Sequence, residues 1–315
     1  MGDEINNEHD LGYKSILSNK KNFIEFMRSF VKKDWVDVIN EDNIVLIDKE
    51  FILEDFKEEE ADLIYKANIE GRDIIFYVLL ELQSKVDFRM PIRLLMYMTE
   101  IWRDELNNTE NNLKKKKEYK LPAIIPIVLY NGKNNWTAVR NFKEILSGHE
   151  LFEDNVVDFR YLLFDVNRMD KNELIDIANV ISSVFLLDQK VEIEELVNRL
   201  KLVGKFIKSK ASKEQEKVFK GWILNILKKR LEDENKEDIA KVLIQISEKE
   251  GDDMISNLGD TIIKGLEERE KIGIEKGIEK IAVNMLKRGD SIEDIIEITE
   301  LSYERIVDIK NKLLN

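Results

Sequence analysis

The residues that could do chemistry lie close together in one stretch of the chain, residues 61–84. Two runs rich in β-branched and aromatic residues flank a short polar break around Gly71, which is the pattern of an antiparallel hairpin. If Gly71 and Arg72 form a two-residue loop, Asp62 lies opposite Glu81. Directly opposed side chains share one face of a sheet, with Cβ atoms roughly 4.5–5.5 Å apart. The spacing therefore predicts two neighbouring carboxylates.

Such a pair has a chemical use. Two carboxylates repel each other unless a positive charge lies between them. Gln83 follows Glu81 by two residues and so points to the same side of the strand. Carboxylates beside a polar side chain suit a hard cation, Mg²⁺ or Mn²⁺, which can orient a phosphodiester and lower the pKa of a bound water. The alternative is that Asp62 and Glu81 merely end two strands and face water.

Composition excludes several other kinds of site. The chain has 315 residues, of which 43% are hydrophobic, so we expect a packed core. It has no cysteine, which excludes disulfides, thiolate catalysis and cysteine zinc sites. Only His9 and His149 could supply imidazole, which argues against a histidine-rich metal site and a serine–histidine triad. The net charge of −13 argues against a broadly basic nucleic-acid-binding protein, without excluding a local basic groove.

The sequence also predicts where the protein is found. Residues 1–10 are polar and acidic and do not resemble a signal peptide. No apolar run approaches the roughly 20 residues that a membrane span needs. We therefore expect a soluble cytoplasmic protein with no membrane contact.

Alternating helices and strands surround the hairpin. Helices are predicted at 13–33, 90–106 and 171–187, and strands at 44–47, 51–53, 121–132 and 159–166. The first helix carries Glu25. Pro126 argues against a fully paired central position for the strand at 121–132. Strands separated by helices predict a mixed α/β layer architecture.

Two basic features follow the hairpin. Arg89, Arg93 and Tyr97 recur at i, i+4 and i+8 of the helix at 90–106. This stripe could face the acids and meet phosphate, or it could be a surface stripe with Tyr97 half packed. Four consecutive lysines, 114–117, could contact a DNA backbone or form a solvated loop.

The character of the chain changes near residue 190. Residues 191–315 are charged, helical in pattern and free of proline. We therefore expect two domains, an α/β domain at 1–190 and an all-helical region at 191–315. The motif Gly-Ile-Glu-Lys occurs twice in succession, at 273–276 and 277–280.

A narrow apolar stripe accompanies that repeat. It consists of Ile274, Ile278, Ile281 and Met285. Such a stripe predicts an association helix at 264–286 that would make the protein a homo-oligomer, although packing onto its own domain would also bury it. Residues 287–315 are predicted to form a small helical module with capping signals. The module could read DNA, but acids match its basic residues, which favours a packing role.

Four segments of the chain resemble a known family. They are Ala-Asp-Leu-Ile-Tyr-Lys at 61–66, Leu-Glu-Leu-Gln-Ser at 80–84, Arg-Leu-Leu-Met-Tyr-Met at 93–98 and Ile-Pro-Ile-Val-Leu-Tyr-Asn-Gly at 125–132. Their order and spacing resemble the recombination-promoting nuclease/putative transposase (Rpn) family, within the PD-(D/E)XK nuclease superfamily. The resemblance implies a restriction-endonuclease-like fold, a mixed β-sheet core flanked by helices. It also implies a Mg²⁺-dependent DNA endonuclease linked to DNA recombination or mobile elements.

The resemblance also assigns roles to residues. Asp62 and Glu81 match the metal-binding acids of the motif, and the Leu82 carbonyl would be a further metal ligand. Gln83 stands where the family's superfamily usually has lysine and would orient the attacking water. Glu25 corresponds to an acid that some members carry on the first helix.

The glutamine is a departure with chemical consequences. A lysine can stabilise developing negative charge, whereas a neutral amide supplies none. Lys66 or Lys85 could substitute, and Lys66 is preferred because strand alternation puts it on the face of Asp62. Lys66 or Arg93 would contact phosphate. The alternative function is a non-cleaving nucleic-acid-binding or self-assembling protein with a degenerate nuclease fold.

Overall fold

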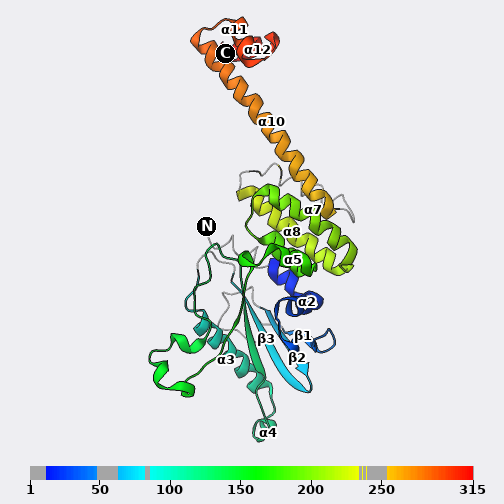
Figure 1. The fold of residues 1–315 in the computed structure, drawn as a ribbon, viewed down its shortest axis with the longest axis vertical. Coiled ribbons are helices and arrows are strands. Elements are labelled where there is room, and N and C mark those ends of the chain that lie inside the picture. Colours follow the sequence, from blue (N-terminus) through cyan, green and yellow to red (C-terminus); the bar gives the residue numbers. More distant parts are fainter. Residues whose placement is uncertain are drawn as a thin grey trace.

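A five-stranded mixed sheet forms the centre of the protein (Figure 1). The computed structural model describes residues 12–47, 63–81, 86–233, 236, 239 and 254–314. The strands lie in the order β1-β2-β3-β4-β5, with β1, β2 and β3 antiparallel and β3, β4 and β5 parallel. Their bounds are β1 Ile44–Ile47, β2 Leu63–Ile69, β3 Arg72–Glu81, β4 Ala123–Tyr130 and β5 Leu162–Asp165. The predicted α/β architecture is confirmed.

Helices account for most of the remaining described residues. The α-helices are α2 Lys20–Phe30, α3 Met90–Asn108, α4 Asn111–Lys114, α5 Lys171–Ile177, α6 Val180–Asp188, α7 Ile193–Lys210, α8 Lys213–Asp233, α10 Met254–Arg288, α11 Ile292–Thr299 and α12 Tyr303–Leu314. Short 3-10 helices are η1 Asp34–Val36, η3 Phe142–Ile145, η4 His149–Leu151, η5 Glu153–Asn155 and η6 Val166–Arg168. The predicted strand at 51–53 lies outside the described residues.

The hairpin forms, but its turn is one residue earlier than predicted. Ile69 pairs with Arg72, so the loop is Glu70-Gly71 and not Gly71-Arg72. Both loop residues have positive φ, 53° and 76°, as a type I′ turn requires. The Asn68 side chain accepts a hydrogen bond from the Gly71 amide at 3.2 Å and fixes the turn.

This turn shifts the whole register by two residues. Leu63 pairs with Val78, so Glu81 has no partner in β2 among the described residues, and the predicted opposition of Asp62 and Glu81 is not the register of this ladder. Asp62 itself lies outside the described residues. Side chains alternate between the two faces of a sheet, so a register shift of two residues leaves every side chain on the face predicted for it.

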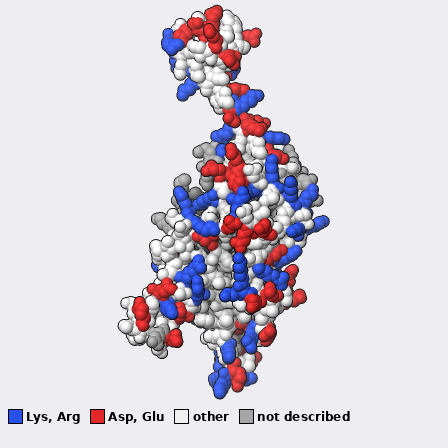
Figure 2. Space-filling model, in the orientation of Figure 1, with Lys and Arg blue, Asp and Glu red and all other residues white. Residues whose placement is uncertain are grey.

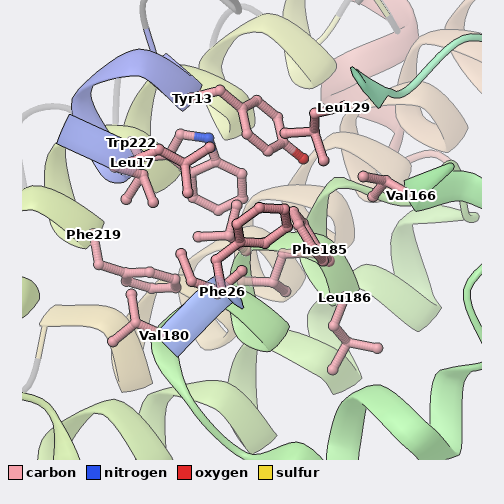
Figure 3. Packing of buried hydrophobic residues seen from close by; sticks show 14 of the residues in the cluster. Tyr13, Leu17, Phe26, Leu129, Val166, Val180, Phe185, Leu186, Phe219 and Trp222 are labelled. Carbon is pink, nitrogen blue, oxygen red and sulfur yellow. The ribbon is translucent and has the colours of Figure 1, made fainter. Parts of the chain in front are cut away.

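Each face of the sheet carries its own hydrophobic core. One face packs against α3, and Tyr77 and Leu79 of β3 lie there with Leu94 of α3. The other face packs against α2 and α6, with Phe26 of α2 buried in that core. Figure 3 shows this second core, in which side chains from distant parts of the chain interlock, including Trp222 of α8. Helices on both sides of one sheet make a three-layer arrangement.

Two predicted helices are interrupted by asparagine caps. The helix predicted at 13–33 breaks at Asn19, whose side chain accepts a hydrogen bond from the Asn22 amide and starts α2. The helix predicted at 171–187 breaks between α5 and α6, where Ala178 has φ 47° and Asn179 forms a capping box with Ser182. Asparagine competes for backbone groups in this way, and so it favours helix starts over helix interiors.

Pro126 lies in β4, which has strands on both sides. It pairs with Tyr77 of β3. The ladder with β5 begins only at Ile127, which pairs with Leu162. The proline therefore lies just before the doubly paired part of β4, a position that its missing N–H tolerates.

The predicted helical C-terminal region is confirmed. Helices α7 and α8 contribute Leu200 and Phe219 to the core that also covers the sheet. That core is continuous across residue 190, and the division into domains at 1–190 and 191–315 remains a prediction. Helix α10 packs on α7 near its start and then projects away from the body to α11 and α12 (Figure 1).

The chain ends in a small module with its own core. Ala282 and Met285 of α10 pack with Ile295 of α11 and with Ile306 and Ile309 of α12. Three of its basic side chains form ion pairs with acids: Arg288 with Asp290, Arg305 with Glu279 and Lys312 with Asp308.

Candidate functional site

The parallel strands end together at one edge of the sheet. Glu81, the last residue of β3, pairs with Tyr130 of β4, which pairs in turn with Asp165 of β5. In sheets with parallel strands, ligands bind outside the carboxyl ends of the strands. This edge, called the strand-end edge below, is therefore the place where a site is expected.

Only part of the predicted metal site falls within the described residues. The backbone of Glu81 ends β3 at the strand-end edge. Asp62, Leu82 and Gln83 lie outside the described residues, and their roles remain predictions. Among the residues that the structure does describe, no three carboxylate or imidazole side chains gather as a metal would need. A divalent-ion site here would thus depend on Asp62 and Glu81, whose oxygen donors fit Mg²⁺ chemically.

Arg93 lies near the start of α3, which follows β3 after a short connection. Its Nη1 donates a hydrogen bond to Asp87 Oδ2 at 3.0 Å. Burial acts to raise the pKa of Asp87, but hydrogen bonds from Arg89 and Arg93 outweigh it and hold that pKa below its usual value. Arg93 is therefore a partly buried cation on the helix that covers the predicted face of Glu81.

Tyr97 is a core residue and not part of an exposed stripe. Its side chain is 3% exposed, and its ring lies 5.2 Å from that of Tyr77 on β3. Arg89, Arg93 and Tyr97 therefore do not form one exposed stripe. Tyr97 packs against the sheet, whereas Arg89 is exposed to solvent.

Lys66 does not reach Glu81. It pairs with Ile75, six residues before Glu81 on β3, which corresponds to about 20 Å along a strand. Its Nζ lies 2.9 Å from Asp73 and 3.2 Å from Glu105. Burial alone would lower the pKa of Lys66, but these two carboxylates raise it overall. The structure therefore gives Lys66 a role in joining the hairpin to α3, and its predicted phosphate contact is not supported.

Glu25 faces the helical region. Gln215 of α8 donates a hydrogen bond to Glu25 Oε1 at 3.0 Å and another to Asn22 Oδ1 at 2.8 Å. Helix α2 presents other side chains to the sheet, such as Phe23, which stacks on Tyr65. The proximity of Glu25 to the metal site remains a prediction that this contact does not favour.

Sequence reasoning missed a buried polar network behind the strand-end edge. The Tyr13 hydroxyl donates to Asp188 Oδ2 at 2.6 Å, and the Asn131 amide donates to the same oxygen. Asn167 Nδ2 donates to the Asn131 carbonyl at 2.9 Å, and Asn167 Oδ1 accepts from the Lys190 amide at 3.0 Å. Burial, and after it Asp188, raises the pKa of Tyr13. The available signal was the pair of asparagines that follow two parallel strands.

This architecture defines a class: an α/β protein with a nuclease-like mixed sheet and an acidic residue at the carboxyl end of a central strand. The sequence profile of the family described as "Putative transposase, YhgA-like" matches residues 7–218. The chain belongs to this family.

Individual relatives are more distant. The chain is 25% identical over 127 residues to the recombination-promoting nuclease RpnD of Escherichia coli O157:H7, covering 40% of this chain and 46% of the relative. It is 24% identical over 125 residues to the recombination-promoting nuclease RpnC of Escherichia coli K12, covering 40% and 39%. It is also 27% identical over 89 residues to a protein of that strain named "Putative inactive recombination-promoting nuclease-like protein YjiP", covering 28% and 86%. The matched parts thus span less than half of the two named nucleases. No solved structure matches the chain.

No helix within the described ranges combines the length and the apolar character that crossing a bilayer requires.

Proposed function

We propose that this protein is a metal-dependent DNA endonuclease that hydrolyses phosphodiester bonds in the context of DNA recombination. The observation that carries the proposal is the position of Glu81 at the carboxyl end of β3, beside the ends of β4 and β5, in a chain of this family. The names of its relatives as recombination-promoting nucleases support the reaction class.

Each site residue has a proposed task. Asp62, Glu81 and the Leu82 carbonyl would hold Mg²⁺, or Mn²⁺ in its place, and the ion would supply Lewis acidity and a bound water of lowered pKa. The Gln83 amide orients the attacking water through hydrogen bonds. Arg93 contributes positive charge near the start of α3, where it can hold a phosphate oxygen.

Replacing Asp62 tests the proposal directly. Asp62→Ala is expected to abolish Mg²⁺-dependent nicking of supercoiled plasmid DNA, while the circular dichroism spectrum stays that of the parent. Asp42→Ala is the matched control, because Asp42 is exposed in the turn before β1. Equal nicking by Asp62→Ala and the parent would contradict the assignment.

A non-cleaving function is the second candidate. It is favoured by the relative named as inactive and by the neutral Gln83 where the superfamily usually has lysine. Calorimetric titration with Mn²⁺ separates the two functions, because only the nuclease needs the ion. Heat of binding that disappears in Glu81→Gln supports the nuclease, whereas no heat from the parent chain supports a binding protein.

We also propose that α10 joins two copies of the chain. Most residues from 267 to 281 are exposed, and Ile274 and Ile281 are 57% and 49% exposed. Nothing within 4 Å would meet a Cβ at Gly273 or Gly277, so a second helix could approach closely there. Of the stripe predicted from the sequence, Met285 is buried in the core of the terminal module and is not available to a partner, whereas Ile274 and Ile281 remain exposed. Exposed apolar surface of this kind can mark an interaction site.

Light scattering of point variants tests this association and leaves the core intact. Ile274→Glu combined with Ile281→Glu is expected to reduce the molar mass in solution to that of one chain. The control is Ile298→Glu, which changes a residue that is 62% exposed on α11. An unchanged mass in the double variant would rule out α10 as the interface.

A further inference from the structure

Four basic residues come together beside the strand-end edge. They belong to four separate segments and are called the strand-end cations below: Lys133 after β4, Arg168 at the end of η6, Lys190 after α6 and Arg230 on α8. The chain as a whole is acidic, with a net charge of −13, and Figure 2 shows both signs mixed over the body of the molecule. Among the described residues at this edge, these four cations lie beside two acids, Asp165 and Asp188.

Arg168 holds the loop that follows β4. Its Nη1 donates to the Gly132 carbonyl at 2.7 Å, its Nη2 to the Lys133 carbonyl at 2.5 Å, and its Nε to Asn135 Oδ1 at 2.9 Å. Three hydrogen bonds from one rigid guanidinium fix the backbone from which the Lys133 side chain extends.

The segment that carries Lys190 is fixed in a similar way. Arg230 Nη2 donates to the carbonyls of Asp188 and Gln189 at 2.7 and 2.8 Å. The Lys190 amide donates to Asn167 Oδ1 at 3.0 Å. The two arginines thus donate hydrogen bonds to backbone carbonyls. These bonds fix the backbone at and beside Lys133 and Lys190.

The acids nearest to the lysines have hydrogen-bond or ion-pair partners of their own. Asp188 lies buried and accepts hydrogen bonds from Tyr13 and Asn131, and Asp165 pairs with Arg168 at 3.3 Å.

Lys133 and Lys190 are both exposed. Neither makes an ion pair within the part of the chain that the structure describes. Burial acts first to lower the pKa of Lys190, and the other strand-end cations add to that effect against the opposing influence of Asp188. Neighbouring positive charges repel one another, and a bound anion between them would relieve that repulsion.

The strand-end cations also lie next to the proposed catalytic position. Tyr130 pairs with Glu81, and Lys133 follows Tyr130 by only three residues. By contrast, the lysines at 114–117 precede β4 and lie with α4 at the opposite end of the sheet (Figure 1). The strand-end cations are thus the basic group that lies at the same end of the strands as Glu81.

We propose that Lys133 and Lys190 bind the phosphate backbone of double-stranded DNA beside the strand-end edge, with Arg168 and Arg230 as positioning residues. The inference rests on the proposed nuclease function, since it names the surface that holds the substrate at that site. Lysine suits this role because its ammonium is a mobile point charge that accepts any phosphate orientation.

DNA binding without cleavage tests the proposal. Fluorescence anisotropy of a labelled 20-base-pair duplex, in EDTA and over a series of KCl concentrations, gives the affinity and its salt dependence. Lys133→Ala combined with Lys190→Ala is expected to weaken binding several-fold and to reduce the slope of log affinity against log salt by about 2, because each lysine neutralises one phosphate. Equal melting temperatures show that the fold is retained.

The matched control is Lys116→Ala combined with Lys117→Ala, which removes two exposed lysines at the other end of the sheet. It is expected to keep both the affinity and the slope of the parent. Parental binding by the Lys133 and Lys190 variant, or an equal reduction in the control, would overturn the proposal. Asp62→Ala is expected to retain DNA affinity, so a failure of the nuclease assignment and a failure of this binding surface give different results.

Discussion

Tyr13 and Asp188 are joined by a 2.6 Å hydrogen bond although 175 residues separate them in the chain. Figure 3 shows the Tyr13 ring packed beside Trp222, with its hydroxyl on the side of Leu129 and Val166. Residues 12–18, which are helical, hold Tyr13. The bond therefore ties this segment to the end of α6, behind the strand-end edge.

Removing that hydroxyl should destabilise the whole core. Tyr13→Phe leaves Asp188 with one fewer donor in a buried setting, which costs about 1–3 kcal/mol, measured by urea denaturation. Burial and Asp188 raise the pKa of Tyr13 in the folded protein. The hydroxyl therefore contributes its full share to the free energy of unfolding below about pH 10, the pKa of tyrosine in the unfolded chain. That contribution is lost as the pH rises further. The difference between parent and variant should therefore narrow above about pH 10. Tyr119→Phe, at a half-buried tyrosine near the surface, is the control; an equal destabilisation there would argue against a special role for the Tyr13 bond.

The hairpin turn depends on glycine at its second position. Gly71 has φ 76° and an added Cβ would meet nothing within 4 Å, so Gly71→Ala should cost about 1–2 kcal/mol through backbone conformation alone. Gly221 also has open space around it but lies inside α8, so Gly221→Ala should stabilise by up to about 1 kcal/mol. Thermal denaturation of both variants should give shifts of opposite sign. Shifts of the same sign would contradict the type I′ turn.

Lys66 should matter for stability and not for cleavage. Lys66→Met removes its ion pairs with Asp73 and Glu105 and is expected to cost at most about 1 kcal/mol, the range for partly exposed ion pairs. Hydrogen bonds from Lys66 and Asn68 outweigh burial and lower the pKa of Asp73. The loss of stability in Lys66→Met should therefore be seen above about pH 4, the ordinary pKa of aspartate. It should disappear as the pH falls through the lowered pKa of Asp73. Plasmid nicking at the parental rate is expected. A large decrease in nicking would restore the phosphate contact predicted from the sequence.

The terminal module should unfold without the body. Ile306 is fully buried in the separate core formed by α10, α11 and α12, so Ile306→Ala should destabilise that module by about 2–4 kcal/mol. Hydrogen exchange should speed up across residues 282–314 and stay unchanged in β2 to β4. Ile298→Ala is the control, because Ile298 is exposed on α11. Faster exchange in the sheet would show that the module and the body are energetically coupled.

The amino-acid sequence by itself determined the local elements. Runs rich in β-branched and aromatic residues defined the two strands around Gly71. The apolar run ending at Tyr130 defined a buried strand, because burial on both faces leaves a continuous apolar pattern. The turn was misplaced by one residue, since a polar break containing Gly71 allows two loops of equal length. Asn19 and Asn179 divided helices because a side-chain cap competes with helix continuation, which apolar periodicity does not reveal.

Tertiary structure alone decided which charged groups meet. Lys66 pairs with Glu105 and Glu25 meets Gln215 of α8, 39 and 190 residues away. The strand-end cations come from four segments that only the parallel order of β3, β4 and β5 and the packing of α6 and α8 bring to one edge. The physical reason is that charge partners are chosen by proximity after the cores have packed, whereas strand and helix patterns are set by the neighbours of each residue along the chain.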